Sequence, residues 1–344
     1  MRSKKLYILG IVFVLILAGI FFYNNRTTSK TKTSYKMGTV VKIKVYSSQA
    51  DSVIGAAFGL LDKLEQELSS HIEDSEINNI NARAGEKAVK VSDDTYQVIS
   101  KALEYAKLSR GRFDPTIGPL VQLWGIGTEN QKVPSDDLLK EKEKLVNYKQ
   151  VRLYPEEKKI KLLKEGMKLD VGGIAKGYAA DQVIELFKER KVKRAFISLG
   201  GNVSVLGTKA DGSPWKVGIQ DPKASRGKVM ASIEVKNKTV VTSGNYERYF
   251  MKNGVRYHHI LNPNTGRPAK NGIISATIVA DNSFDADALS TVVYIMGVDQ
   301  GLKLINELSN VQALVVTENN NIYFSKGLKD KVNLLKDKKY QIAN

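Results

Sequence analysis

The N-terminal segment divides this chain into two chemically different parts. Residues 6–23 (LYILGIVFVLILAGIFFY) carry no charge and directly follow three basic residues, Arg2, Lys4 and Lys5. An apolar run of about 18 residues lies at the short end of what spans a bilayer, and it is longer than a typical signal-peptide core. We therefore expect residues 1–23 to form a single N-terminal transmembrane helix, with a cleaved signal peptide as the alternative.

The end of this apolar run favours an uncleaved anchor. Phe21, Phe22 and Tyr23 stand where a signal peptidase requires small residues, and aromatic side chains are typical of the interfacial end of a spanning helix. Leu17-Ala18-Gly19 resembles the start of a lipoprotein signal, but Ile20 occupies the position of the lipidated cysteine. We expect a protein of the cell membrane whose catalytic domain is extracytoplasmic.

The remaining chain must fold without covalent crosslinks. It contains no cysteine, which excludes disulfides, a thiolate nucleophile and Cys-ligated metals. The whole sequence has a formal net charge of +17, which would suit an anionic partner. The lysines are scattered among acidic residues without interleaved aromatic side chains, so a solvated surface is favoured over nucleic-acid binding.

Strand-like and helix-like patterns are mixed along the chain. We expect a polar linker over residues 24–34, one domain over 35–330 and a C-terminal tail over 331–344. Residues 37–47 alternate as a strand does, residues 51–71 have a helical apolar period, and residues 133–154 have the composition of a charged helical insertion. Asn253-Gly254 predicts a hairpin turn. These patterns predict an α/β fold with mixed α+β character.

A glycine-rich turn at residues 169–183 (LDVGGIAKGYAADQV) joins a predicted strand to a predicted helix. Gly172 and Gly173 permit close approach of a ligand, and the first amides of the following helix could bind an anion. The segment matches neither the P-loop nor the dinucleotide-binding fingerprint. On spacing alone, an ordinary strand-to-helix turn is the favoured interpretation over a phosphate cradle.

Two oxygen-bearing side chains share one face of a predicted helix near the C-terminus. Asp287 and Thr291 are four residues apart, and their oxygens could bind a hard cation such as Mg²⁺. Asp285 lies close by. The competing interpretation is that Asp285 and Asp287 only cap the helix and complement its dipole, which the spacing by itself favours.

Histidine is rare in this sequence. His258 and His259 are adjacent in a predicted strand, so their side chains must point in opposite directions and at most one can enter a given site. The third, His71, is the last residue of the helical segment predicted over residues 51–71. No motif of a serine or zinc hydrolase is present.

Eight segments, taken in order, resemble those of the ApbE family, the FAD:protein FMN transferases. The resemblance covers residues 37–324, and no single segment would carry it. The segments are MGT from Met37, DSEINNIN from Asp74, GRFDPTIGPLVQLWGIG from Gly111, LDVGGIAKGYAADQV from Leu169, SLGGNVSVLG from Ser198, TSGNYERYF from Thr242, HHILNPNTGRP from His258 and DADALST from Asp285.

The resemblance implies an ApbE-like fold with a T-fold-like core and an enzyme that uses FAD and Mg²⁺. Such an enzyme breaks the FAD pyrophosphate, releases AMP and links FMN through a phosphoester to a Thr or Ser of a target protein. It implies that Gly173, Asp287 and Thr291 hold the cation. The residues that it places against FAD are Met37, His71, Leu123, Trp124, Gly125, Asp170, Lys176, His259 and Ile260.

Several questions stay open on the sequence. The general base could be Asp287, Asp285 or His259. His71 stands where many family members carry an aromatic residue, which leaves an FAD pyrophosphatase or a non-catalytic flavin-binding protein as alternatives to the transferase. The expected partners are FAD and exported or membrane electron-transfer proteins with a flavinylation motif, and no nucleic acid. The target itself, cleavage of the N-terminal segment and the oligomeric state are not predicted.

Overall fold

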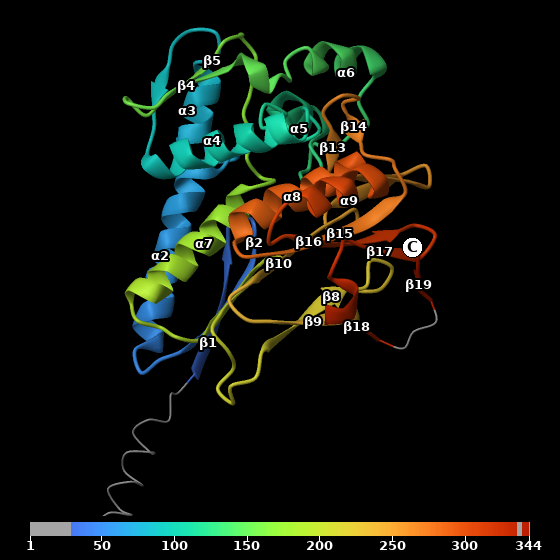
Figure 1. Cartoon of the computed structure of the whole chain (residues 1–344). Helices are drawn as coiled ribbons and strands as arrows, with labels where there is room; N and C mark the ends of the chain where they lie inside the picture. Colours follow the sequence, from blue (N-terminus) through green and yellow to red (C-terminus); the bar gives the residue numbers. More distant parts are fainter. Residues whose placement is uncertain (1–28, 336–338, 344) are drawn as a thin grey trace, which may run out of the picture.

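A nine-stranded mixed sheet forms the centre of the computed structural model, which describes residues 29–335 and 339–343 (Figure 1). Its strand order is β1-β2-β6-β7-β10-β15-β16-β17-β19. The strands are β1 (Ser29–Lys36), β2 (Thr39–Tyr46), β6 (Ala195–Leu199), β7 (Asn202–Leu206), β10 (Thr239–Gly244), β15 (Ile273–Ala280), β16 (Gln312–Thr317), β17 (Asn321–Phe324) and β19 (Gln341–Ile342).

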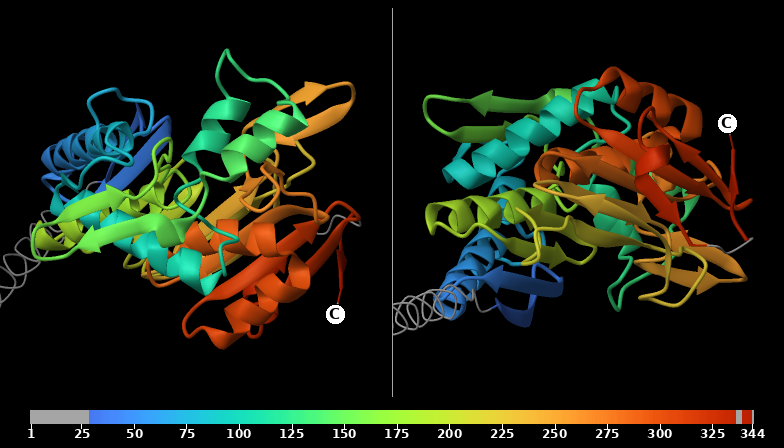
Figure 2. Two further views of the ribbon diagram at one scale, coloured as in Figure 1. Left: turned by 90° about the horizontal axis from the view of Figure 1, so that it is seen from above. Right: turned by 60° about the horizontal axis from the view of Figure 1, so that its bottom comes forward.

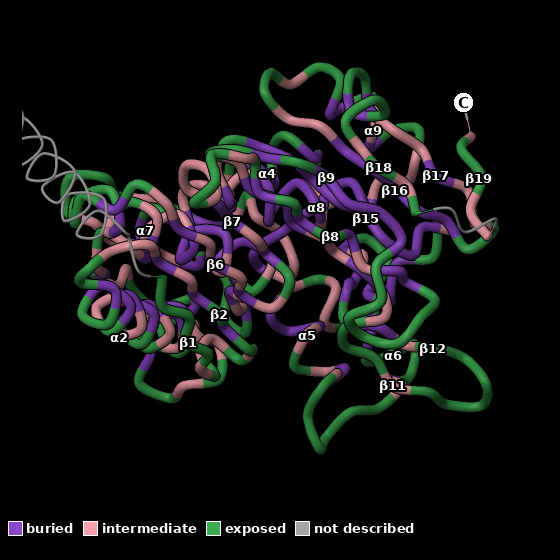
Figure 3. Tube along the Cα trace, turned by 90° about the horizontal axis from the view of Figure 1, so that it is seen from below, coloured by how far each residue is buried: buried purple, intermediate pink, exposed green. Residues whose placement is uncertain are grey.

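Both faces of this sheet are covered. Helices α2 (Ala50–Leu68), α7 (Ala175–Glu189), α8 (Ser283–Met296) and α9 (Val298–Glu307) pack over one face and share its main core. The second face packs against a three-stranded sheet of β8 (Trp215–Gln220), β9 (Val229–Val235) and β18 (Val332–Leu334). Strand β15 (IISATIVA) is buried at every position, because a strand covered on both faces needs apolar or small residues throughout. Figure 3 draws the buried residues in purple along the chain trace.

The remaining elements extend the main core or build a smaller apolar cluster around Trp124 and Leu261, except the last, a 3-10 turn that precedes β18. They are α3 (Glu76–Ala82), β3 (Val89–Lys90), α4 (Asp93–Leu108), α5 (Gly118–Trp124), α6 (Asp136–Glu143), the 3-10 turn Tyr148–Gln150, β4 (Val151–Tyr154), β5 (Lys159–Leu162), β11 (Tyr249–Lys252), β12 (Val255–His258), β13 (Leu261–Asn262), β14 (Arg267–Pro268) and the 3-10 turn Lys329–Lys331. Trp124 of α5 packs against Tyr257 of hairpin β11–β12, and Figure 2 shows these segments side by side.

The sheet register defines two ends of the molecule. Ser29 pairs with Tyr46, and the β6–β7 pair begins at the same end. We call this the Ser29 end. The turn between β1 and β2 and the last residue of β10 lie at the opposite end, which we call the Gly38 end. Helix α7 begins at the Gly38 end and leads back to β6 at the Ser29 end.

The predicted mixed α/β fold and the Asn253-Gly254 hairpin are confirmed, but three segment predictions need correction. Residues 29–34 of the predicted linker belong to β1, because they pair with β2 along their whole length and Lys30 and Lys32 bind Asp51 of α2. The predicted tail supplies β18 and β19, which pair with β9 and β17. Residues 133–154 form one short helix followed by β4, rather than a helical insertion.

The predicted transmembrane helix at residues 1–23 lies outside the described residues. Within residues 29–335 and 339–343, no helix is both long and apolar enough to cross a membrane.

Candidate active site

The glycine-rich turn is held at the Gly38 end of the sheet by Asp170. One carboxylate oxygen of Asp170 accepts from the amide of Gly172 at 2.9 Å, and the other accepts from the hydroxyl of Ser70 at 2.8 Å. Lys176, in the first turn of α7, donates to the Gly172 carbonyl at 3.1 Å. Two predicted ligand contacts, Asp170 and Lys176, therefore lie on one short turn.

Helices α7 and α8 touch at Gly177. The amide of Gly177 donates to Oδ2 of Asp287 at 2.8 Å, so a carboxylate of α8 satisfies a free donor in the first turn of α7. A Cβ at position 177 would lie 2.2 Å from the Ser283 carbonyl oxygen and 2.7 Å from Cβ of Asp287. Only glycine permits this approach. The capping interpretation of Asp287 is therefore correct in part, although the helix that it caps is α7.

The second oxygen of Asp287 accepts no hydrogen bond from any residue that the structure describes. Asp287 is 4% exposed, and its Oδ1 is not among the polar atoms that are both fully enclosed and without a partner. This oxygen therefore keeps some contact with solvent. Lys176 Nζ lies 4.0 Å from Oδ2. One carboxylate oxygen thus has a structural role, while the other is available to a ligand.

Thr291 lies one turn along α8 from Asp287 and faces the glycine-rich turn. A Cβ placed on Gly173 would be 3.6 Å from Oγ1 of Thr291. The same hydroxyl lies 3.4 Å from Oγ of Ser243, and Ser243 Oγ is 2.7 Å from Oγ of Ser290. The structure therefore brings together all three predicted cation ligands, from segments more than a hundred residues apart in sequence.

Asp285 belongs to a different environment. Its carboxylate accepts from Tyr105 Oη at 2.6 Å and from Asn282 Nδ2 at 2.8 Å, and it pairs with Lys101 at 3.2 Å. Burial acts to raise its pKa, but these donors outweigh burial and hold the pKa of Asp285 below its usual range. A carboxylate engaged by three donors is a poor proton acceptor, so this geometry argues against Asp285 as the base.

Asp181, in the middle of α7, caps the start of α8. Its two oxygens accept from the amides of Ser283 and Phe284, each at 2.8 Å. Burial raises the pKa of Asp181 to about 6, against the lowering effect of the two amide hydrogen bonds. The two helices therefore cap each other through Asp181 and Asp287.

The adjacent histidines point in opposite directions, as predicted. His258 is buried, and its Nε2 lies 3.1 Å from the Ala269 carbonyl oxygen. His259 is exposed, and its Nδ1 lies 3.2 Å from the Arg248 carbonyl oxygen. A carbonyl only accepts, so Nδ1 of His259 carries a proton and a neutral ring leaves Nε2 free as an acceptor.

Surrounding protein lowers the pKa of His259, with smaller contributions from the positive charges of Arg248 and Lys176. The ring keeps contact with solvent, and its lowered pKa favours a neutral imidazole at pH 7. His259 bonds to the Arg248 carbonyl, and the Arg248 side chain reaches the Gly38 carbonyl. Asp285 is fully engaged and Asp287 is placed beside the other proposed cation ligands, so His259 is the candidate base whose acceptor atom has no other proposed role.

Met37 occupies a strained backbone conformation. It has φ 50°, followed by Gly38 at φ 66°, and together they form the two-residue turn between β1 and β2. The Met37 amide donates to Glu65 of α2 at 2.7 Å, and Arg248 donates to the Gly38 carbonyl at 2.9 Å. A non-glycine residue at positive φ is uncommon, and such residues often lie at functional sites.

The other predicted FAD contacts differ in what they can offer. Trp124 and Ile260 are buried, and the Trp124 indole donates to the Gly266 carbonyl at 2.6 Å. These two side chains form core, so a ligand could reach only the main chain of Trp124 and Ile260, whereas the Leu123 side chain is half-buried. His71 is exposed and follows Ser70, whose hydroxyl donates to Asp170 and so fixes this loop to the glycine-rich turn. This loop therefore lies beside the glycine-rich turn.

Three residues that sequence reasoning did not single out have a place here. Ser243 contacts the Thr291 hydroxyl, Arg248 links Gly38 to His259, and Gly177 permits the contact of the two helices. Ser243 and Arg248 both lie within the segment TSGNYERYF, which carried part of the family resemblance. Their individual roles had no signal in the sequence, because each depends on a long-range contact.

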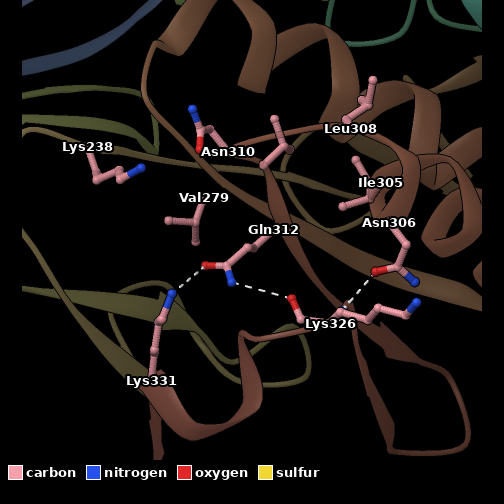
Figure 4. A pocket seen from close by; sticks show the side chains of 10 residues that line it. Lys238, Val279, Ile305, Asn306, Leu308, Asn310, Gln312, Lys326 and Lys331 are labelled. Atoms are coloured by element: carbon pink, nitrogen blue, oxygen red, sulfur yellow. Dashed lines mark hydrogen bonds between the residues drawn. The ribbon is translucent and has the colours of Figure 1, made fainter.

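A pocket of about 330 Å³ lies elsewhere, between α9, β16 and the segment after β17 (Figure 4). It is lined by Lys238, Lys326 and Lys331, three amide side chains and four apolar side chains. None of the predicted site residues lines it. Within the described part of the chain, no group of three or more His, Cys, Asp or Glu side chains is placed to hold a metal.

Known proteins resemble this chain over most of its length. The model of the ApbE family matches residues 37–315. A curated FAD:protein FMN transferase of Treponema pallidum (strain Nichols) is 35% identical over 354 residues, which cover 97% of this chain and 98% of the relative. A second, from Klebsiella pneumoniae (strain 342), is 34% identical, and the match covers 84% of this chain and 89% of the relative.

Solved structures show the same fold. The ApbE protein of Thermotoga maritima has a TM-score of 0.82 at 35% identity, with 88% of this chain and 99% of that chain covered. The flavin transferase ApbE of Vibrio cholerae has a TM-score of 0.80 at 26% identity, with the same coverage.

Proposed function

The chain belongs to the ApbE family and is an FAD:protein FMN transferase, and we propose that it cleaves FAD between its two phosphates and attaches FMN to a target hydroxyl. The P–O bond that links the FMN phosphate to AMP breaks, and AMP leaves. A new P–O bond forms to the oxygen of a Thr or Ser, whose proton passes to a base. The observation that carries this proposal is the convergence of Asp287, Thr291 and Gly173 beside Lys176.

We infer that Mg²⁺ binds where these residues meet. Asp287 Oδ1, Thr291 Oγ1 and the Gly173 carbonyl would hold it, and they are the oxygen donors that Mg²⁺ prefers. A site with one carboxylate suits an ion that takes its other ligands from water and substrate phosphates. The ion would neutralise negative charge on the pyrophosphate as the bond breaks.

The protein's own residues supply binding and proton transfer. Lys176 brings a positive charge to the first turn of α7, where free amides also favour phosphate. Asp170 fixes the turn against Ser70, so these groups are in place before substrate binds. We propose His259 as the base, because its Nε2 is free and its neutral form is favoured at pH 7.

The catalysed reaction can be followed from both products. We would incubate the full chain with FAD, Mg²⁺ and a candidate electron-transfer protein, then measure AMP and the flavin fluorescence that stays on the denatured target. Transfer gives both signals in equal amounts. AMP and free FMN without labelled protein would identify a pyrophosphatase, and FAD binding without AMP would identify a flavin-binding protein.

His259 is tested by its replacement with glutamine. We expect FAD binding to persist, measured by flavin fluorescence, while transfer falls by about 100-fold or more, as for loss of a general base. Wild-type transfer should be retained as the pH is lowered through 6.5, the ordinary histidine value, because the pKa of His259 lies below it. Full activity of the glutamine variant would exclude His259 as the base.

We also propose that residues 6–23 anchor the enzyme in the cell membrane, with the catalytic domain outside the cytoplasm. The support is the uncharged apolar run, its basic N-terminal flank and its aromatic end. The targets would then be exported or membrane electron-transfer proteins. Flotation of the full chain with lipid vesicles, and its resistance to extraction by salt and alkali, tests the anchor.

A further inference from the structure

A cluster of unpaired positive charges lies between α7 and β6. Arg190, Lys191, Lys193 and Arg194 surround the buried Val192, and three of the four are exposed. None of them has a carboxylate within ion-pair distance among the described residues, whereas the preceding Lys188 pairs with Glu185 at 2.6 Å. We call these four residues the basic turn. A cluster of exposed positive charges without ion-pair partners attracts an anionic partner from outside the protein.

The basic turn lies at the Ser29 end of the sheet. The Arg194 carbonyl accepts from the amide of Tyr46 at 3.1 Å, and Tyr46 pairs with Ser29 across β1 and β2. Two strand spacings, about 10 Å, thus separate the basic turn from the first described residue. In Figure 1 this end is the lower one, below the label of β1.

Neighbouring loops extend the positive surface. A Cβ on Gly207 would lie 2.1 Å from the Lys193 carbonyl oxygen, so the loop after β7 touches the basic turn. The Gly207 amide donates to the Asn237 side chain at 2.6 Å, which adds the loop before β10. Lys209 and Lys236 lie in these two loops and have no ion pair within the described residues. Glu189 and Asp211 are the nearby acidic residues that form no ion pair within the described residues. Positive charges therefore outnumber negative charges on this surface.

The chain itself limits how far this surface can be from a membrane. Residues 24–28 are the only ones between the apolar run and Ser29, and five residues span at most about 18 Å. Screening in physiological salt reduces electrostatic attraction beyond about 8 Å, and a tether of this length lets the basic turn come within that range of the headgroups.

We propose that the basic turn docks on anionic lipid headgroups and holds the catalytic domain with its Ser29 end toward the membrane. The inference depends on the proposed anchor at residues 6–23. Strand β1 alone is about 27 Å long, and the candidate active site lies at its far end. FAD and the target protein would therefore approach from the aqueous side.

The absence of cysteine makes a site-specific test possible. A single cysteine at Thr208, beside the basic turn, or at Asn264, in the exposed loop between β13 and β14, is labelled with a fluorescent donor. Each full-length variant is reconstituted in vesicles of phosphatidylcholine, alone or mixed with phosphatidylglycerol, that carry a headgroup acceptor. We expect energy transfer from position 208 to rise severalfold with phosphatidylglycerol and transfer from position 264 to stay low.

Charge reversal separates the basic turn from general electrostatics. R190E, K191E, K193E and R194E combined should abolish the effect of phosphatidylglycerol at position 208. A matched control reverses four exposed lysines elsewhere (K140E, K149E, K252E and K270E) and should keep the effect. AMP release from FAD, measured in each variant, reports an intact active site.

Each other outcome contradicts the proposal in a distinct way. Equal energy transfer from position 208 in both vesicle types would exclude lipid docking and point to an acidic protein partner. A phosphatidylglycerol effect that survives reversal of the basic turn would show that other residues face the lipid. Failure of the full chain to float with either vesicle would overturn the anchor and this inference together. AMP release shows separately whether the catalytic proposal stands.

Discussion

The amide of Gly177 donates to Oδ2 of Asp287 across 2.8 Å, at a point where no side chain larger than hydrogen fits between α7 and α8. This contact sets the position of the carboxylate that we propose as a cation ligand. It also joins the glycine-rich turn to the second half of the chain, so the geometry of the site depends on how closely two helices approach.

Gly177→Ala tests that dependence. The added methyl group would lie 2.2 Å from the Ser283 carbonyl oxygen, so the helices must separate. We expect a loss of about 1–3 kcal/mol in the free energy of unfolding and a loss of AMP release of about 100-fold. Thermal unfolding and product formation measure the two effects.

Gly55→Ala is the matched control, since both glycines lie in helices but nothing is within 4 Å of a Cβ at position 55. It should stabilise the protein by about 0.5–1 kcal/mol and leave activity unchanged. Equal behaviour of the two variants would show that the helix contact has no special role.

Asp287→Asn separates the capping role of this residue from its proposed cation binding. The amide oxygen can still accept from Gly177, so the unfolding temperature should change little. The lost negative charge should reduce AMP release by at least about 100-fold, and added Mg²⁺ should restore little of it. Near-normal activity in this variant would exclude Asp287 as the metal ligand.

Ser243→Ala tests whether a strand residue orients a proposed ligand. Its hydroxyl lies 3.4 Å from Thr291 Oγ1 and 2.7 Å from Ser290 Oγ. We expect the Mg²⁺ concentration for half-maximal activity to rise about 10-fold, while activity at saturating Mg²⁺ changes less. Ser243→Thr keeps a hydroxyl and should recover the wild-type Mg²⁺ dependence, which a general loss of packing would not allow.

His258 should make the protein less stable in mild acid. Burial lowers its pKa from 6.5 to about 4, so between these values the unfolded chain binds a proton that the folded chain does not. The free energy of unfolding therefore falls as the pH falls through this window, by up to about 3 kcal/mol for the whole shift. Denaturant unfolding of His258→Gln should show a weaker pH dependence, and an unchanged one would show that other groups govern it. His71→Gln, at an exposed loop residue, is the control.

The sequence predicted local features better than long-range ones. The Asn253-Gly254 hairpin and the opposed directions of His258 and His259 follow from the rules of single strands, and both are confirmed. The pairing of residues 29–34 was missed because their Thr, Ser and Lys side chains suggest a solvated linker. In the structure Lys30 and Lys32 both bind Asp51, and the strand lies at the edge of the sheet, where polar residues are common.

The candidate site shows the same limit. Asp287 and Thr291 could be paired by their spacing on one helix, but their neighbours Gly173 and Ser243 come from other elements. Spacing also grouped Asp285 with Asp287. The structure separates them, because Asp285 turns to Tyr105 and Lys101 and Asp287 turns to Gly177. Without the ordered family segments, a capping role for both would have been the better prediction.

The turn at Met37 implies a conflict between folding and catalysis. A side chain at φ 50° costs the folded state about 1–2 kcal/mol that asparagine or glycine would largely avoid. Keeping methionine there makes sense only if its side chain has a use that outweighs this loss, such as the expected contact with FAD. Selection for thermal stability alone would thus be expected to replace Met37, and the stabilised enzyme would be the poorer catalyst.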